Sequence, residues 1–123
     1  MTDVRSYRDL VVWQKGMELA EEAYKLAKLM PKTEEYRLTS QLLRAAVSIP
    51  ANIAEGSSRG TRRDYANFIS IARGSLGETE TLLELAVRCE LVKAEHAQRA
   101  QSLTDEIGRM LTVLRQRLTE TTG

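Results

Sequence analysis

The residues best suited to chemistry lie in one short turn, Gly-Ser-Ser-Arg-Gly-Thr-Arg-Arg, at positions 56–63. Three guanidinium groups, those of Arg59, Arg62 and Arg63, gather there at the start of a predicted helix. Free backbone N–H groups and the helix dipole favour anions at a helix N-terminus, and arginine binds phosphate through paired hydrogen bonds. One interpretation of the turn is therefore a contact with phosphate groups, for example of RNA or DNA. In the alternative interpretation it is a solvated loop whose arginines pair with Glu55 and Asp64.

A second group of polar residues indicates a structural network. Arg44, Ser48, Asn52 and Glu55 form a thin polar line along an otherwise apolar segment. Further along the chain, Arg73 could pair with Glu55 or with Glu78. We interpret these contacts as a structural polar network and not as a catalytic one.

Patterns typical of enzymes are missing from the sequence. The single histidine, His96, directly follows Glu95, whereas a di-iron helical bundle needs two Glu-x-x-His elements. His96 is therefore predicted to be exposed. The single cysteine, Cys89, has no histidine near it and is predicted to be a small core or boundary residue. No Gly-x-Ser-x-Gly elbow or Gly-x-x-x-x-Gly-Lys loop is present, so we expect no catalytic residue, no cofactor and no metal.

Composition limits the remaining classes of protein. The chain has 123 residues, 42% hydrophobic and 28% charged, with a net charge of +1. These values predict one globular domain with a core and no bulk electrostatic attraction to nucleic acid or membrane. One cysteine fits a reducing compartment, and no apolar run approaches the roughly 20 residues of a membrane span. The first residues do not resemble a secretory signal, so we expect a cytoplasmic protein without membrane contact.

Apolar residues recur at steps of three and four through most of the chain. This spacing predicts helices over about 10–30, 33–55, 61–89 and 96–118, the second starting at a Thr33 cap and the third at a Thr61 cap. Short connections between the helices favour an all-α, antiparallel four-helix bundle. We expect a single domain over 1–123 with its core over about 7–118.

The second helix is apolar around most of its circumference, from Leu42 to Ala54. A helix of this kind is expected to be covered on several sides, by the rest of the domain or by another subunit. We therefore predict a stable oligomer that assembles through the first three helices. Pro50 removes a backbone hydrogen bond and clashes with the preceding turn, which predicts a kink there or a break after Ile49. Gly56 is expected to end the helix.

The third helix has a line of small residues: Ser70, Gly74, Gly77 and Thr81. Glycine within a helix costs about 1 kcal/mol relative to alanine, so two glycines indicate that something passes close to the backbone. We expect a tight helix–helix crossing, with a ligand groove as the alternative.

Three segments resemble a known family: LVVWQ at 10–14, YRLTSQLLRAAVSIPANIAEG at 36–56 and FISIARGSLGE at 68–78. They are similar to the small four-helix-bundle proteins first noticed as reading frames in intervening sequences of bacterial 23S rRNA genes. The resemblance covers nearly the whole chain, and the AAVSIPANIAEG block is specific to this family. Arg37 stands where the family often has glycine. Leu43 stands where it often has arginine, which removes one basic contact.

The resemblance implies a homopentamer with subunits side by side around a central axis. It also implies kinship with the accessory variability determinant of diversity-generating retroelements, which binds nucleic acid and partners a reverse transcriptase. Members of the family themselves have no established activity.

Two functional classes follow from these observations. The first is a non-enzymatic oligomeric protein that binds RNA, DNA or a nucleic-acid-processing protein. The second is a purely structural protein–protein assembly module. They differ in whether the arginines of the turn repeat around a ring as one basic surface. If the turn is not the contact surface, the arginines of the fourth helix are the alternative: Arg99, Arg109, Arg115 and Arg117.

Overall fold

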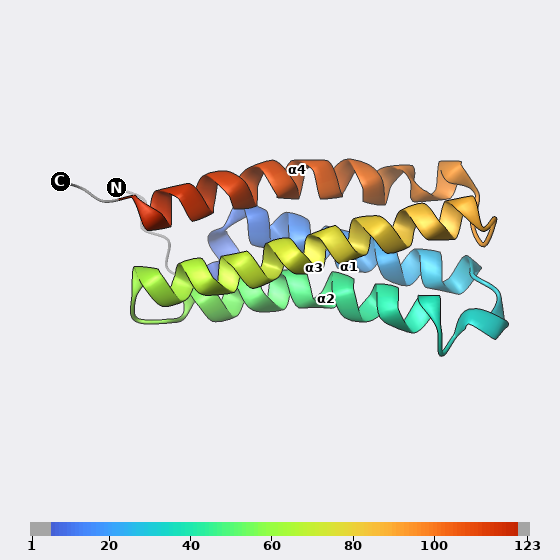
Figure 1. Ribbon diagram of the computed structural model, residues 1–123, viewed down its shortest axis with the longest axis horizontal. Coiled ribbons are helices and arrows are strands. Elements are labelled where there is room, and N and C mark those ends of the chain that lie inside the picture. The colour runs from blue at the N-terminus through green and yellow to red at the C-terminus, as the bar shows by residue number, and fades with distance from the viewer. Residues whose placement is uncertain (1–5, 121–123) are drawn as a thin grey trace.

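Four long helices make up the computed structural model, which describes residues 6–120. The elements in order are η1 (Tyr7–Asp9), α1 (Val11–Leu29), η2 (Lys32–Glu34), α2 (Leu38–Ser57), α3 (Arg62–Arg88) and α4 (Ala94–Thr119). Figure 1 shows the helices side by side, with successive helices running in opposite directions. The prediction of an all-α four-helix fold is confirmed. The outermost residues of the predicted domain, 1–5 and 121–123, lie outside the described range.

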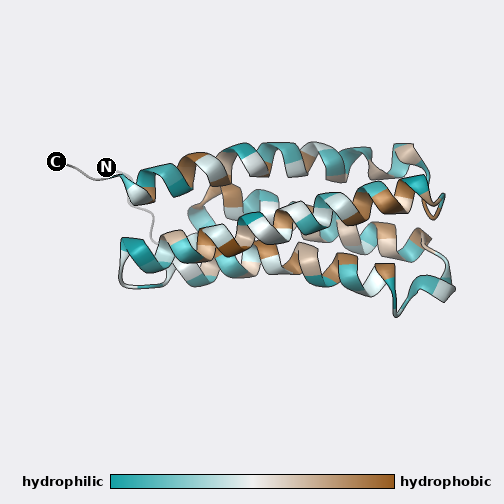
Figure 2. Ribbon diagram, in the orientation of Figure 1, coloured by the Kyte–Doolittle hydropathy of each residue, from teal (hydrophilic) through white to brown (hydrophobic). Residues whose placement is uncertain are grey.

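The four helices occupy the corners of a square. Helix α1 packs against α2 and α4, and α3 packs against the same two helices, whereas α1 and α3 lie on a diagonal without close backbone contact. Fully buried leucines and isoleucines from all four helices fill the centre, among them Leu19, Ile49, Ile69 and Leu103. Figure 2 shows mostly hydrophilic residues along α4 and more hydrophobic residues along α2 and α3. Within residues 6–120 no helix combines the length and hydropathy that crossing a membrane requires.

Of the two helix starts predicted from capping residues, one is observed and one is not. The Thr61 hydroxyl accepts a hydrogen bond from the Asp64 backbone N–H at 3.1 Å, and α3 begins at Arg62, as its cap predicts. The predicted start of the second helix at Thr33 is wrong. A short 3₁₀ turn forms there, and α2 begins at Leu38. No residue of that turn is buried, so packing does not hold the segment in the α conformation.

Pro50 does not break α2, and the expected break after Ile49 is wrong. The helix continues to Ser57, and Ile49 and Ile53 are fully buried on either side of the proline. Pro50 packs against α1 at Gly16, where an added Cβ would lie 3.4 Å from the Pro50 Cβ, at the edge of ordinary van der Waals contact. Core packing thus offsets the missing backbone hydrogen bond. A bend at Pro50 stays a prediction.

The glycines differ from their predicted roles. Gly56 lies inside α2 without a positive φ, and it does not end the helix. A Cβ there would lie 2.8 Å from the Phe68 Cβ, so this glycine permits the close approach of α2 and α3. Gly74 and Gly77 have nothing within 4 Å of an added Cβ, so the tight crossing predicted for them does not occur within the chain.

Cys89 is exposed, so its predicted place in the core or at its boundary is wrong. It lies just past the end of α3, where the last apolar residue of the helix to be buried is Ala86. The exposure predicted for His96 is observed.

Alanine substitutions at the glycines should separate these environments. Gly56→Ala should destabilise the fold by about 1–3 kcal/mol, because Phe68 or the backbone must shift. Gly74→Ala should stabilise the fold by up to about 1 kcal/mol, because the site is open and alanine favours the helix. Urea unfolding of the two variants measures both effects. A destabilising Gly74→Ala would contradict an open environment and would indicate that another subunit's backbone covers that face.

Candidate functional site

The predicted anion-binding turn lies at one end of the bundle, between α2 and α3. Arg59, Arg62 and Arg63 are all exposed there. The Arg59 guanidinium donates to Glu55 Oε1 at 3.1 Å and lies over the Phe68 ring, 4.8 Å from its centroid. The ion pair of Arg59 with Glu55 is the one expected if the turn is a solvated loop. The planar face of the Arg59 guanidinium also packs against an aromatic ring.

Arg62 joins the turn to the C-terminal part of α4. Its guanidinium donates a hydrogen bond to the backbone carbonyl of Arg117, near the end of α4. On the same helix, Arg115 Nε donates to Ser70 Oγ of α3 at 2.5 Å. The start of α3 and the end of α4 therefore bring Arg62, Arg63, Arg115 and Arg117 to one end of the molecule. We call these four residues and Arg59 the arginine end.

The arginine end combines the turn with part of α4, which the sequence offers as alternative contact surfaces. Two of the four arginines on α4 belong to it, and the other two do not. Arg99 pairs with Glu18 of α1 at 2.6 Å, and Arg109 lines a groove between α3 and α4. Within residues 6–120, neither Arg62 nor Arg63 forms an ion pair, so the predicted pairing of these arginines with Asp64 does not occur.

The polar network predicted from Arg44, Asn52, Glu55, Arg73 and Glu78 does not form as a unit. Arg73 lines the groove between α3 and α4 and therefore faces away from Glu55. The contacts that form instead involve serines. The Asn52 amide donates to the carbonyl and the hydroxyl of Ser48, both at 2.8 Å, and the Ser48 and Ser75 hydroxyls lie 2.8 Å apart. This small network links the middle of α2 to the middle of α3.

An aromatic pocket of about 500 Å³ lies next to the turn. Tyr7 of η1 and Phe68 of α3 line it, together with residues of α2 and the residue that follows it: Ala51, Asn52, Ala54, Glu55 and Ser58. The Tyr7 ring meets Trp13 edge-on, with centroids 5.2 Å apart, and the Arg8 guanidinium lies 5.5 Å from the Tyr7 centroid. Sequence reasoning missed this pocket, because its two rings are 61 positions apart and no local pattern relates them.

Comparison with known proteins supplies the family. A family model described as 23S rRNA-intervening sequence protein matches residues 8–113, which is most of the chain. The chain belongs to this family. The crystal structure of a protein of unknown function from the S23 ribosomal protein family of Bacteroides thetaiotaomicron is similar, with a TM-score of 0.79 and 33% identity. That match covers 85% of this chain and 98% of the other. Curated proteins give no match.

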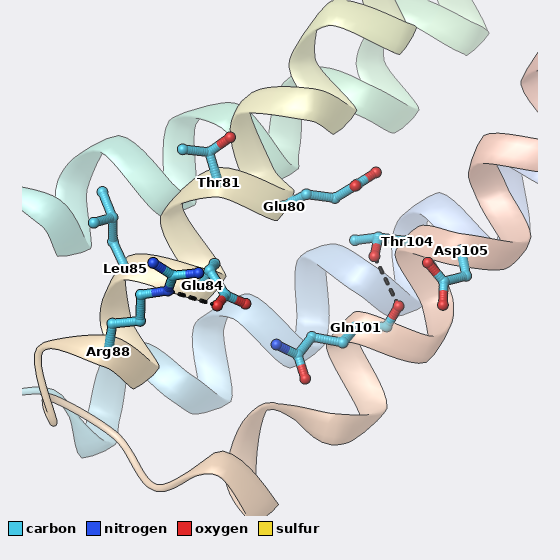
Figure 3. Close-up of a pocket in the computed structure, with 8 residues that line it drawn as sticks. All are labelled: Glu80, Thr81, Glu84, Leu85, Arg88, Gln101, Thr104 and Asp105. Carbon is cyan, nitrogen blue, oxygen red and sulfur yellow. Dashed lines mark hydrogen bonds and ion pairs between the residues drawn. The ribbon is translucent and has the colours of Figure 1, made fainter.

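The intervening-sequence protein also has a groove between α3 and α4, but its side chains do not suggest catalysis. Figure 3 shows Glu80 and Glu84 of α3 pointing toward α4, whereas Arg88 lies along α3. Together with Gln101, Thr104 and Asp105 of α4, these residues line a space of about 540 Å³. Arg88 pairs with Glu84 at 2.8 Å. Among the described residues, no group of three histidine, cysteine or acidic side chains is placed to hold a metal ion. The groove thus offers neither a nucleophile with a base nor a metal site.

Glu80 gives this groove a testable electrostatic property. Burial raises the pKa of the Glu80 carboxyl above its ordinary value of 4.5, and the charge of Asp105 adds to the shift. Because the folded state holds this proton more tightly, stability should fall as pH rises from 4.5 through the folded pKa. Glu80→Gln should therefore be slightly more stable than wild type at neutral pH and equal to it below pH 4.5.

Urea unfolding at acidic and neutral pH measures the effect of Glu80→Gln. Glu78→Gln, on the same helix and outside the groove, controls for the loss of one negative charge. The same gain in both variants would show that the effect comes from net charge and not from the groove.

Proposed function

We propose that this intervening-sequence protein is a non-enzymatic homo-oligomer that binds nucleic acid through its arginine end. The observation that carries the proposal is the contact between Arg62 and the Arg117 carbonyl, because it gathers arginines from two helices on one surface. Arginine suits phosphate because its planar, always charged guanidinium can donate two parallel hydrogen bonds. A nucleic-acid-processing protein is the other partner class that the family resemblance implies. The single, free and exposed Cys89 supports placing the protein in the reducing cytoplasm.

The geometry of the arginines supports contact with the phosphate backbone more than base reading. No helix of the described chain presents a row of exposed arginine, asparagine and glutamine side chains of the sort that reads a groove. Phosphate contacts position a protein on nucleic acid without selecting its sequence. We therefore propose binding that is largely independent of sequence and sensitive to salt.

Assembly would strengthen a surface that is weak in one chain. The net charge is only +1, and the Asp64 carboxylate lies in the first turn of α3, close to the arginines. Repetition of the arginine end around a homo-oligomer, a pentamer by family resemblance, would make several weak contacts act together. The assembly could then present a strongly positive surface although each chain is nearly neutral.

Exposed apolar side chains support an oligomer. Ile71 of α3 is 50% exposed, Val113 of α4 is 45% exposed, and Val47 of α2 is 42% exposed. Beside Ile71, the open glycines Gly74 and Gly77 leave the α3 backbone accessible to another subunit. The same observations favour the alternative function, a purely structural assembly module, which needs no arginine surface.

The first prediction of this proposal is that the protein forms a stable oligomer at micromolar concentration. Burial of the exposed apolar residues on α1, α2 and α3 would drive assembly. Sedimentation equilibrium or light scattering should then give a multiple of the 13.8 kDa chain mass. A monomer mass would contradict both proposed functions.

The second prediction concerns the arginines of the turn. The triple variant Arg59→Gln, Arg62→Gln, Arg63→Gln should bind unrelated RNA and DNA probes more weakly, and by about the same factor for each. The slope of log affinity against log salt should become shallower by about 0.7 for each single-strand phosphate that the variant no longer neutralises. Fluorescence anisotropy during a salt titration measures both quantities.

A matched control is Arg37→Gln, Arg44→Gln, Arg88→Gln, which removes the same charge from exposed positions outside the turn. Circular dichroism and sedimentation should show that both triple variants remain folded and assembled. If wild type binds no probe at low salt, the nucleic-acid function is wrong and the assembly module takes its place. If the two triple variants bind equally, the contact surface lies away from the turn.

A further inference from the structure

The aromatic pocket beside the arginine end has a shape and lining that suit one flat, polar molecule. We propose that it receives an unpaired nucleobase, so that the ligand of the arginine end is a single-stranded nucleic acid. This inference rests on the proposed function, because it specifies the ligand of the same surface. It also goes beyond the phosphate contacts, since it assigns a place to a base.

The two rings of the pocket supply stacking surfaces. Base stacking on an aromatic side chain contributes to single-strand binding and tolerates any base. Both Tyr7 and Phe68 are half-buried, and their neighbours hold them in place. Trp13 and Arg8 pack on Tyr7, while Arg59 covers one side of Phe68. Rings that are already fixed lose little conformational freedom when a base binds.

The pocket is wide and shallow, and small side chains from α2 line it. Ala51 and Ala54 contribute only methyl groups to the lining, and the space at the surface is about 500 Å³. A base stacked inside a duplex is covered on both faces and cannot reach such a pocket, whereas an unpaired base can be turned out into it. The geometry therefore favours single strands over duplexes.

The polar atoms of the pocket are mostly acceptors. The Asn52 amide N–H groups are engaged by Ser48, which leaves its carbonyl oxygen for a ligand. Glu55 uses one oxygen for Arg59, and the Ser58 hydroxyl donates to the Ala54 carbonyl, so a Glu55 oxygen and the Ser58 lone pairs also accept. Acceptors match bases that carry an exocyclic amino group, so cytosine should bind better than uracil.

The arginines of the turn adjoin the pocket and would hold the backbone of the same strand. Arg59 connects the two parts, because its guanidinium lies over Phe68 while its chain position is next to Ser58 of the pocket. A base in the pocket would thus place its flanking phosphates toward Arg59, Arg62 and Arg63. Stacking and phosphate contact would then act on one ligand, each with its own dependence on salt.

The experiment compares the full-length protein with variants on three probes: short oligo(C), short oligo(U) and an RNA duplex of the same length. Tyr7→Leu and Phe68→Leu remove a ring and keep an apolar side chain. Tyr36→Leu is the matched control, since Tyr36 is 89% exposed and precedes α2, at the opposite end of the bundle. Anisotropy at several salt concentrations gives the affinities and salt slopes.

Wild type should bind oligo(C) more tightly than oligo(U), and both more tightly than the duplex. Each ring variant should weaken single-strand binding at least about fivefold, and Tyr7→Leu should leave the salt slope and duplex binding unchanged. Tyr36→Leu should bind like wild type. Equal binding of oligo(C), oligo(U) and duplex by wild type, or ring variants that behave like Tyr36→Leu, would overturn the inference.

Ala51→Leu tests the pocket without removing a ring. Residue 51 is exposed on α2 and lines the pocket, so a leucine should fill the space without disturbing the core. It should weaken oligo(C) binding and leave the duplex unaffected, and oligo(C) binding as tight as wild type would overturn the inference. The single tryptophan, Trp13, reports independently, because its fluorescence should change when oligo(C) binds beside Tyr7.

These results distinguish the inference from the proposed function. If the ring variants bind normally while the arginine triple variant loses affinity, the proposed phosphate-binding surface is supported and the proposed base pocket is wrong. If wild type binds none of the three probes, both the proposed nucleic-acid function and the proposed base pocket are wrong. In that case the pocket is left as a surface for an aromatic or proline-containing segment of a protein.

Discussion

The close approach of α2 and α3 at Gly56 determines the form of the candidate surface. A side chain at this position would overlap Phe68 and press on Tyr65, so only glycine lets the end of α2 lie directly on the start of α3. The approach places Phe68 beside Glu55 and Arg59, and it brings the turn next to the end of α4. The aromatic pocket and the arginine end both depend on it, because their residues come from η1, the end of α2, the start of α3 and the end of α4, which lie together at this corner.

Tertiary packing, and not local helix propensity, decides where α2 begins and whether it continues through Pro50. Pro50 disfavours a continuous helix by about 3 kcal/mol in an ordinary interior. Helix α2 nevertheless continues, because fully buried isoleucines flank the proline and its ring packs against α1 at Gly16. The opposite holds for residues 33–37. They have the polar and acidic residues of a helix start, but without buried side chains they form only a 3₁₀ turn and a loop.

The part of the structure that could be predicted from sequence is the part that local spacing encodes. Apolar steps of three and four located all four helices, and the Thr61 cap located the start of α3 within one residue. The roles of Gly74 and Gly77 could not be predicted, because a line of small residues looks the same whether a neighbour packs on it or not. Likewise, the contacts that build the site join Arg62 to residue 117 and bring Tyr7 close to Phe68, and such distant pairs leave no periodic signal.

The position of the arginine end has a consequence for any ring of subunits. All of its arginines lie at the end of the bundle that holds the α2–α3 turn and the end of α4 (Figure 1). Subunits packed side by side around an axis along the bundle would all present this end on the same face of the ring. Weak ion pairs such as Arg59–Glu55 are exposed and worth at most about 1 kcal/mol, so they would yield readily to phosphate. A ring of this kind would therefore concentrate positive charge and aromatic pockets on one face, although each chain has a net charge of only +1.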